Sequence, residues 1–207
     1  RIGILTIREK WELLIEKKTS WKTQDYLSEK FPIQFNGSNN IWISGKVCPT
    51  KTISAQVKKL KTDQVLFAGD TLIAVNTGKD LRLPHPLSKE NLRRHFEVIE
   101  SEDKPLEINF LWDIFLKNEF AIREDFALLT HGRKSQSISS SNKFACSDQI
   151  FIEKGAVVEC SVLNASNGPI YIGKNAEVME GSLIRGPFAL GENAALKMGA
   201  KIYGATT

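Results

Sequence analysis

The sequence of 207 residues is long enough for two modest domains. Its composition is globular, with 42% hydrophobic and 25% charged residues, no apolar run long enough to cross a membrane and no signal-peptide pattern. The net charge of +4 gathers in residues 1–61, where 12 Lys and Arg face 5 Asp and Glu. We expect a solvated surface there and no nucleic-acid site, because aromatic residues do not alternate with these charges in a recognisable module. Three cysteines without metal-ligand spacing indicate a reduced, cytoplasmic protein.

The first part of the chain alternates between helix and strand patterns. Thr6 and Glu9 form a capping-box pattern ahead of a helix with one apolar face, and Thr23 is expected to begin a second short helix that ends near Lys30. The next expected elements are a strand, a helix and a hairpin, over residues 41–43, 53–60 and 65–75. This alternation indicates part of an α/β sheet.

Prolines interrupt every pattern between residues 76 and 110. A helical period then returns, with one apolar stripe formed by Leu111, Phe115, Ile122, Phe126 and Leu129. The serine-rich segment 135–142 is typical of a linker. We therefore expect a partial α/β domain with its linker over residues 1–142 and a second domain over residues 143–207.

In the last third of the chain an aliphatic residue returns at every sixth position. These residues are Ile172, Val178, Ile184, Leu190, Leu196 and Ile202. A period of six fits neither a helix nor an alternating strand, but it fits a chain that turns a corner every six residues and stacks coil on coil. The repeat predicts a parallel β-helix, and a run of short sandwich strands is the alternative.

The same phase extends backward through Ile152, Val158 and Asn164, with two extra residues near 167–169 that predict a corner loop. About three coils result. The chain starts at Arg1 without Met and ends on a complete hexad at Thr207. Since a solenoid needs a cap, we expect a fragment of a longer polypeptide.

Several blocks of the sequence resemble the bacterial sugar nucleotidyltransferases that are similar to the bifunctional N-acetylglucosamine-1-phosphate uridyltransferase/glucosamine-1-phosphate acetyltransferase. They are residues 1–11, 112–115, 122–126, 179–190 and 197–207. The resemblance implies a Rossmann-like nucleotidyltransferase domain followed by a left-handed β-helix that assembles as a homotrimer. It also implies transfer of a nucleotide from a nucleoside triphosphate to a sugar phosphate, synthesis of a UDP-N-acetylglucosamine-like product, acetyl transfer from acetyl-CoA, and Mg²⁺.

The departures from the family pattern concern both reactions. The glycine-rich loop that cradles nucleotide phosphates would lie before Arg1, so we expect this fragment alone to be inactive. Arg1, Arg8 and Lys10 lie next to that loop and are candidate phosphate ligands, with plain surface positions as the alternative for Arg8 and Lys10. Asp70 is the candidate Mg²⁺ ligand, although an ordinary turn aspartate is the favoured alternative.

Acetyl transfer in the family uses a histidine base, and none of the three histidines lies in the repeats. Leu190 stands where the resemblance places a substrate-binding arginine. The remaining candidates for an acyl or substrate site are Arg185, Lys197, Lys201 and Tyr203. The catalytic residues stay unassigned.

Three hypotheses follow. The chain is the core of a sugar nucleotidyltransferase/acetyltransferase-type enzyme, a non-catalytic hexapeptide-repeat trimerisation scaffold, or an acyltransferase with a degenerate nucleotidyl domain.

Overall fold

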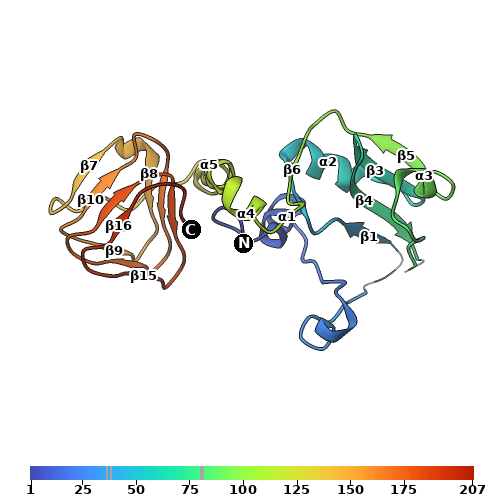
Figure 1. The fold of residues 1–207 in the computed structure, drawn as a ribbon, viewed down its shortest axis with the longest axis horizontal. Coiled ribbons are helices and arrows are strands. Elements are labelled where there is room, and N and C mark those ends of the chain that lie inside the picture. The colour runs from blue at the N-terminus through green and yellow to red at the C-terminus, as the bar shows by residue number, and fades with distance from the viewer. Residues whose placement is uncertain (36, 38, 80–81) are drawn as a thin grey trace. The chain divides into compact units, whose positions relative to one another are not determined.

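The computed structural model describes residues 1–35, 37, 39–79 and 82–207. The chain forms two compact units, an α/β unit (Ile7–Ile108) and a coil unit (Arg1–Thr6 with Asn109–Thr207) (Figure 1). The contacts thus group the first six residues and the helices after residue 108 with the repeats. The division after residue 142 stays a prediction about the modules of the sequence.

The α/β unit is built on a four-stranded sheet of order β1-β4-β3-β5. Its strands are β1 (Asn40–Ile43), β3 (Gln64–Ala68), β4 (Thr71–Gly78) and β5 (Glu97–Glu100). The predicted hairpin is confirmed, since β3 and β4 pair antiparallel, and β3 also pairs parallel with β5. The expected α/β sheet is therefore present, with mixed strand directions.

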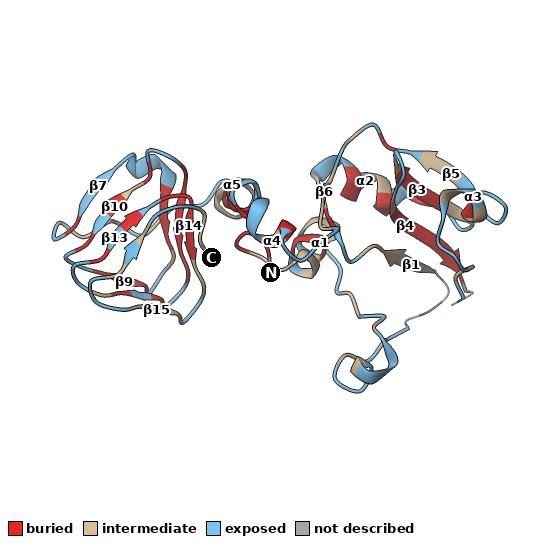
Figure 2. Ribbon diagram, in the orientation of Figure 1, coloured by how far each residue is buried: buried red, intermediate tan, exposed pale blue. Residues whose placement is uncertain are grey.

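Helices cover both faces of this sheet. They are α1 (Ile7–Ile15), α2 (Lys51–Lys59) and the short α3 (Lys89–Leu92). Trp11 of α1 and Ile53 of α2 pack with Leu66 of β3 on one side, while Leu92 of α3 packs with Val65 of β3 on the other. Figure 2 shows the buried strands β3 and β4. Successive residues of a strand point to opposite faces, so β3 contributes to two cores.

The remaining elements of the α/β unit are short. The helix expected from Thr23 to Lys30 is only one 3₁₀ turn, η1 (Asp25–Leu27). Strand β2 (Val47–Cys48) pairs antiparallel with β6 (Leu106–Glu107), which lies in the stretch whose prolines hid any pattern. Thr50 caps α2 by accepting a hydrogen bond of 3.1 Å from the Ile53 N–H.

The coil unit contains the predicted parallel β-helix of about three coils, consistent with the left-handed form. One face holds β7 (Lys143–Ala145), β10 (Val162–Asn164), β13 (Leu183–Arg185) and β16 (Lys201–Ile202). The second holds β8 (Ile150–Ile152), β11 (Ile170–Ile172) and β14 (Phe188–Leu190). The third holds β9 (Val157–Val158), β12 (Glu177–Val178) and β15 (Ala195–Leu196).

The repeated aliphatic residues stack in columns inside the coils. Ile152, Ile172 and Leu190 pair in sequence along one face. The phase predicted for Asn164 is wrong, because Leu163 is the fully buried residue that pairs with Ile184. The interval from Val158 to Leu163 is one residue shorter than the six-residue period, and the interval from Leu163 to Ile172 is three residues longer. Together these two changes give the two extra residues that the spacing shows.

Helix α5 (Asn118–Thr130) covers the outer side of the face made by β8, β11 and β14. Ile122 and Phe126 of α5 pack there against Phe151 and Tyr171. The first half of the predicted stripe is wrong. A break at Lys117 separates α5 from the short α4 (Asp113–Leu116), and Leu111 and Phe115 are exposed.

The serine-rich segment is not a linker. The Ser135 hydroxyl accepts a hydrogen bond of 2.9 Å from the Ile152 N–H, and the Gln136 side chain donates to the Ala156 carbonyl at 2.9 Å. Asn142 donates to the Val158 carbonyl at 2.7 Å. Short polar side chains thus satisfy the backbone groups at the first coil, where no earlier strand pairs with them.

Candidate functional site

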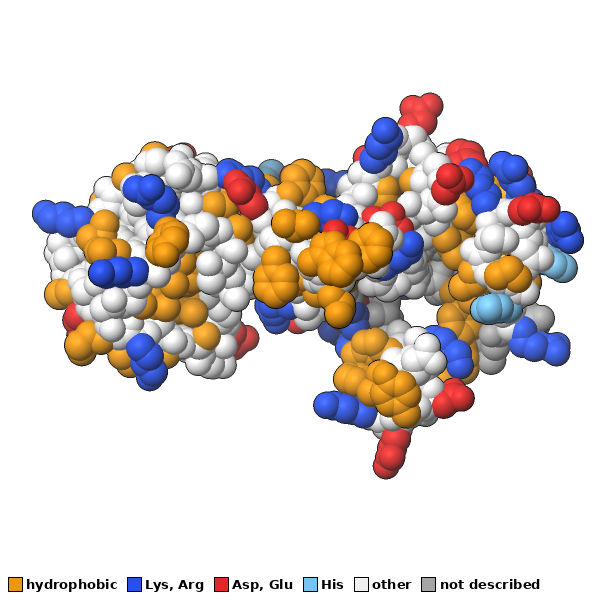
Figure 3. Space-filling view, viewed as in Figure 1, with side chains coloured by type: hydrophobic (Ala, Val, Ile, Leu, Met, Phe, Trp, Pro, Cys, Tyr) orange, Lys and Arg blue, Asp and Glu red, His pale blue; other side chains and the backbone are white. Residues whose placement is uncertain are grey.

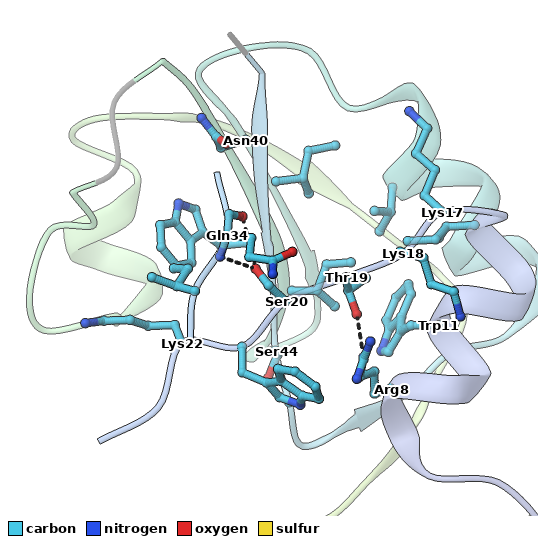
Figure 4. A pocket seen from close by; sticks show the side chains of 18 of the residues that line it. Arg8, Trp11, Lys17, Lys18, Thr19, Ser20, Lys22, Gln34, Asn40 and Ser44 are labelled. Carbon is cyan, nitrogen blue, oxygen red and sulfur yellow. Dashed lines mark hydrogen bonds between the residues drawn. The ribbon is translucent and has the colours of Figure 1, made fainter. Parts of the chain in front are cut away.

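A groove with a cavity volume of about 1020 Å³ opens in the α/β unit between α1, the segment after it, and strand β1 (Figure 4). The volume is that of a small-molecule site. Its charged lining residues are Arg8, Lys17, Lys18, Lys22, Lys58 and Glu16. Its aromatic lining residues are Trp11, Trp21, Phe35 and Trp42. The lining is therefore both cationic and aromatic.

Arg8 lies at one side of this groove. Its Nε donates to Glu12 Oε1 at 2.7 Å and to the Thr19 hydroxyl at 3.3 Å. Its guanidinium carbon lies 3.9 Å from the centre of the Trp21 ring, a cation–π arrangement. These contacts fix the plane of the guanidinium, and a planar fork held in this way suits phosphate oxygens.

Glu12 organises the segment that follows α1. Its carboxylate accepts from the Thr19 N–H at 2.9 Å and from Lys18 Nζ at 3.1 Å. Burial alone would raise the pKa of Glu12, but the hydrogen bonds from Thr19, Lys18 and Arg8 together lower that pKa to about 2. Glu12 is thus a permanent anion behind the groove wall, and it orders two of the cations in the lining.

The rest of the segment is held by local hydrogen bonds. The Ser20 hydroxyl donates to the Gln34 carbonyl at 3.1 Å and accepts from the Gln34 N–H at 3.0 Å, as the dashed lines of Figure 4 show. This pair joins the two stretches of chain that carry Trp21 and Phe35.

Two aromatic side chains meet at strand β1. The rings of Phe35 and Trp42 lie edge to face with centres 6.1 Å apart, and Trp42 Nε1 donates to the Thr77 hydroxyl at 3.1 Å. Lys17 and Lys22 line the same groove, and within the described ranges neither forms an ion pair. Cations of this kind together with ring faces can bind a phosphate and stack a planar base.

The three predicted phosphate ligands differ in their structural surroundings. Only Arg8 lines the groove. Lys10 is 3% exposed and lies on the buried side of α1, not at a surface position. Arg1 belongs to the coil unit, where its guanidinium donates to the Ile4 carbonyl. The roles of Arg1 and Lys10 stay predictions.

Asp70 is an exposed residue of the β3–β4 turn and does not line the groove. Lys89 Nζ donates to the carbonyl of the neighbouring Gly69 at 2.6 Å, so a cation already lies at this turn. In the part of the chain that is described, no three Asp, Glu, His or Cys residues gather as metal ligands. This placement does not fit a Mg²⁺ site, and we derive no step through a metal.

The four acyl-site candidates are all exposed on the β-helix. Lys201 pairs with Leu183, two residues before Arg185 on the same strand, and Tyr203 directly follows β16. Three candidates thus share the face made by β7, β10, β13 and β16, whereas Lys197 follows β15 on another face. Their role in acyl transfer stays a prediction.

Sequence reasoning missed the aromatic wall of the groove. Trp21, Phe35 and Trp42 lie within residues 1–61, the basic stretch for which the sequence predicts a solvated surface. The signal was present as rings spaced among lysines between residues 17 and 35. These rings have no interpretable period, because Trp21 and Phe35 lie in irregular backbone and Trp42 lies in the short strand β1.

The family comparison concerns the first two thirds of the chain. Residues 1–134 match the family model of sugar nucleotidyl transferases. Among curated proteins, none matches the chain significantly. Since the family model covers more than half of the sequence, the protein belongs to the sugar nucleotidyl transferase family.

Proposed function

We propose that the protein takes part in synthesis of an amino-sugar nucleotide similar to UDP-N-acetylglucosamine, and that the groove of the α/β unit holds the nucleotide. Family membership supports a nucleotidyltransferase-type activity. The observation that carries the assignment of the nucleotide to the groove is the lining, in which five cationic side chains lie among aromatic rings.

The charges of the groove match those of the substrates. A nucleoside triphosphate and a sugar 1-phosphate both carry anionic phosphoryl oxygens, and joining them releases pyrophosphate. Arg8 would orient a phosphate through its fixed guanidinium, while Lys17 and Lys22 add positive charge along the groove. Trp21 or Trp42 offers a ring face for the base. These residues bind and orient, and the proposal assigns no proton transfer to them.

The β-helix supports the second half of the proposal, a homotrimer that binds acetyl-CoA. The face formed by β7, β10, β13 and β16 exposes apolar side chains to solvent: Phe144, Val162 and Leu183 are 50%, 39% and 45% exposed. Such a flat apolar face suits contact with a second and third copy. Arg185 and Lys201 on the same face would then meet the phosphates of acetyl-CoA near the seam between copies.

The proposed compartment is the cytoplasm, since Cys48, Cys146 and Cys160 are all free. Among the described residues, no helix is both long enough and apolar enough to traverse a bilayer.

The test is binding of UTP, UDP-N-acetylglucosamine and N-acetylglucosamine 1-phosphate to this chain, measured by calorimetry. We expect Lys22→Glu to weaken UTP binding at least about tenfold, because one lost charge-assisted contact is worth about 1.5–3 kcal/mol. Lys59→Glu is the matched control: the same charge change, on α2 of the same unit, outside the groove. Equal affinities for the two variants would contradict the assignment of the groove.

Two alternatives give different results in the same assays. A trimerisation scaffold binds none of the three ligands. An acyltransferase with a degenerate nucleotidyl domain binds acetyl-CoA but not UTP, and its affinity falls in Arg185→Glu or Lys201→Glu while Lys22→Glu leaves it unchanged.

A further inference from the structure

The coil unit carries, from the turn before α4 to the first turn of α5, a short segment with inverted polarity. Its polar residues Asp113 and Asn118 are 7% and 9% exposed, while its large apolar side chains face solvent. Six large apolar residues form this exposed surface, which is called the α4 patch below, and their exposed fractions run from 55% to 81%. They are Phe110, Leu111, Trp112, Phe115, Leu116 and Phe120. Figure 3 shows hydrophobic side chains gathered over α4.

Partly buried hydrogen bonds hold this segment in its orientation. Asp113 Oδ2 accepts from the N–H groups of Asn109 at 2.8 Å and Phe110 at 3.1 Å, and it lies 3.2 Å from Lys117 Nζ. The hydrogen bond from Asn109 is the main reason why the pKa of Asp113 is lowered. The carboxylate therefore fixes the turn from inside, and rotation of the segment that buried its apolar side would break these bonds.

Asn118 fixes the other end of the segment. Its Oδ1 accepts from the Gly3 N–H at 2.8 Å, and its Nδ2 donates to the Ala205 carbonyl at 3.3 Å. The rings of Phe110 and Trp112 stack in parallel with centres 4.8 Å apart. The exposed apolar surface is thus a preorganised feature and not a loose loop.

The size of the patch decides what can cover it. With roughly 200 Å² for each large side chain and about two thirds of it exposed, the six residues present on the order of 800 Å². The largest apolar patch of an ordinary monomer is about 300–600 Å². About 800 Å² is what one partner contributes to a stable protein–protein interface.

We propose that the α4 patch is the interface between two copies of this chain. Its area is that of one half of a standard interface, and its stacked aromatic surface can pack against an identical surface across a two-fold axis. The charges that flank it are paired within the chain, as Asp113 with Lys117 and Arg123 with Glu119 at 2.8 Å. The rim therefore offers little net charge for a phosphate-rich partner.

The test measures self-association of the full chain by sedimentation velocity over a range of concentrations. The wild type is expected to associate. Phe115→Lys is expected to raise the dissociation constant of self-association at least about 30-fold, because one central aromatic anchor is lost. Leu111→Lys is a second variant of the patch, because a side chain that is 81% exposed can change without loss of the fold. Tyr26→Lys is the control, an aromatic residue that is 82% exposed in the α/β unit. Circular dichroism verifies that each variant is folded.

Two further arms identify the occupant. In a Cys146→Ser, Cys160→Ser background, Phe115→Cys should give a covalent dimer with a short bis-maleimide, and Tyr26→Cys should not. Leu183→Lys separates this interface from the proposed β-helix trimer. If Leu183→Lys abolishes association and the two patch variants do not, the α4 proposal is wrong and the trimer remains. A wild type that stays monomeric, association that is unchanged in both patch variants, or sedimentation with phosphatidylcholine vesicles in place of self-association would each overturn the proposal.

Discussion

The carboxylate of Asp125, in the middle of helix α5, accepts a hydrogen bond of 2.8 Å from the backbone N–H of Ile4. The same oxygen accepts from the Leu5 N–H at 3.0 Å. Gly3 approaches so closely that a Cβ on it would lie 2.5 Å from this oxygen, and its φ of +72° favours glycine. The apolar run at the start of the chain is therefore held against α5 by this buried carboxylate together with Asn118, and Ile4 completes the core under that helix.

We expect Asp125→Ala to lower the free energy of unfolding of the coil unit by about 2–3 kcal/mol, because two buried N–H groups lose a charged acceptor. Asp125→Asn should cost less, since an amide oxygen still accepts. Glu124→Ala, on the exposed side of the same helix, is the control and should change stability by less than about 0.5 kcal/mol. Urea unfolding followed by circular dichroism measures all three, and equal midpoints for Asp125→Ala and Glu124→Ala would contradict the anchoring role.

The fold was predictable wherever a period repeats. The six-residue spacing after Ile172 is read directly as coils, since each aliphatic residue fills the same inner place. The spacing fails at Asn164 because one residue is missing and three are added within the same coil, and only the pairing of Leu163 with Ile184 shows this. The predicted stripe through Leu111 and Phe115 fails for a different reason. Buried polar groups at Asp113 and Asn118 rotate the segment against its own periodicity.

The candidate site was less accessible to sequence reasoning. Arg8 was identified from its position after the expected phosphate loop, but the Trp21 ring under its guanidinium comes from irregular chain. Lys10 is close to Arg8 in the sequence, but it lies two residues further along the helix and therefore on the buried side of α1. A groove assembled from a helix, a loop and a strand edge has no linear signature, so its lining follows only from tertiary contacts.

Adjacent residues of strand β13 provide a matched test of the β-helix core. Ile184 is 2% exposed and packs inside the coils, whereas Leu183 is 45% exposed on the outer side of the same strand. Ile184→Ala should lower the free energy of unfolding by about 2–5 kcal/mol, through lost burial and the cavity it leaves. Leu183→Ala should cost less than about 1 kcal/mol in the monomer. Comparable losses in thermal or urea unfolding would mean that the two side chains do not face opposite sides.

Two glycines at equivalent corners differ in the space around them. A Cβ on Gly173 would lie 2.7 Å from the backbone nitrogen of Glu192 and 2.8 Å from the carbonyl oxygen of Leu190, in the next coil. A Cβ on Gly191 meets nothing within 4 Å. Backbone of the neighbouring coil cannot move without breaking its ladder, so Gly173→Ala should cost about 1–3 kcal/mol or more. Gly191→Ala should be neutral or stabilising by up to about 1 kcal/mol. The two melting temperatures, measured side by side, decide whether the coils stack this closely.

The last prediction concerns the acid behaviour of the groove wall. Hydrogen bonds from Thr19, Lys18 and Arg8 outweigh burial and lower the pKa of Glu12 from 4.5 to about 2 in the folded state. A group whose pKa is depressed on folding stabilises the fold fully above its unfolded pKa and loses that contribution as the pH falls toward the folded pKa. The stabilisation by Glu12 is therefore complete above about pH 4.5 and declines between pH 4.5 and 2.

We expect Glu12→Gln to lower the free energy of unfolding at pH 7 by about 1–2 kcal/mol, as measured by urea unfolding. The charged acceptor is lost while the shape of the side chain is kept. The difference between the two proteins should shrink steadily below pH 4.5, because protonation then removes the same charge from the wild type. Tryptophan fluorescence is the appropriate signal in a Trp112→Phe background, because the other three tryptophans, Trp11, Trp21 and Trp42, all belong to the α/β unit. Glu29→Gln, a change at an exposed carboxylate of the same unit, serves as the control and should leave the pH profile unchanged. A difference that stays constant from pH 7 to pH 3 would show that the Glu12 side chain stabilises the loop through its shape and not through its charge.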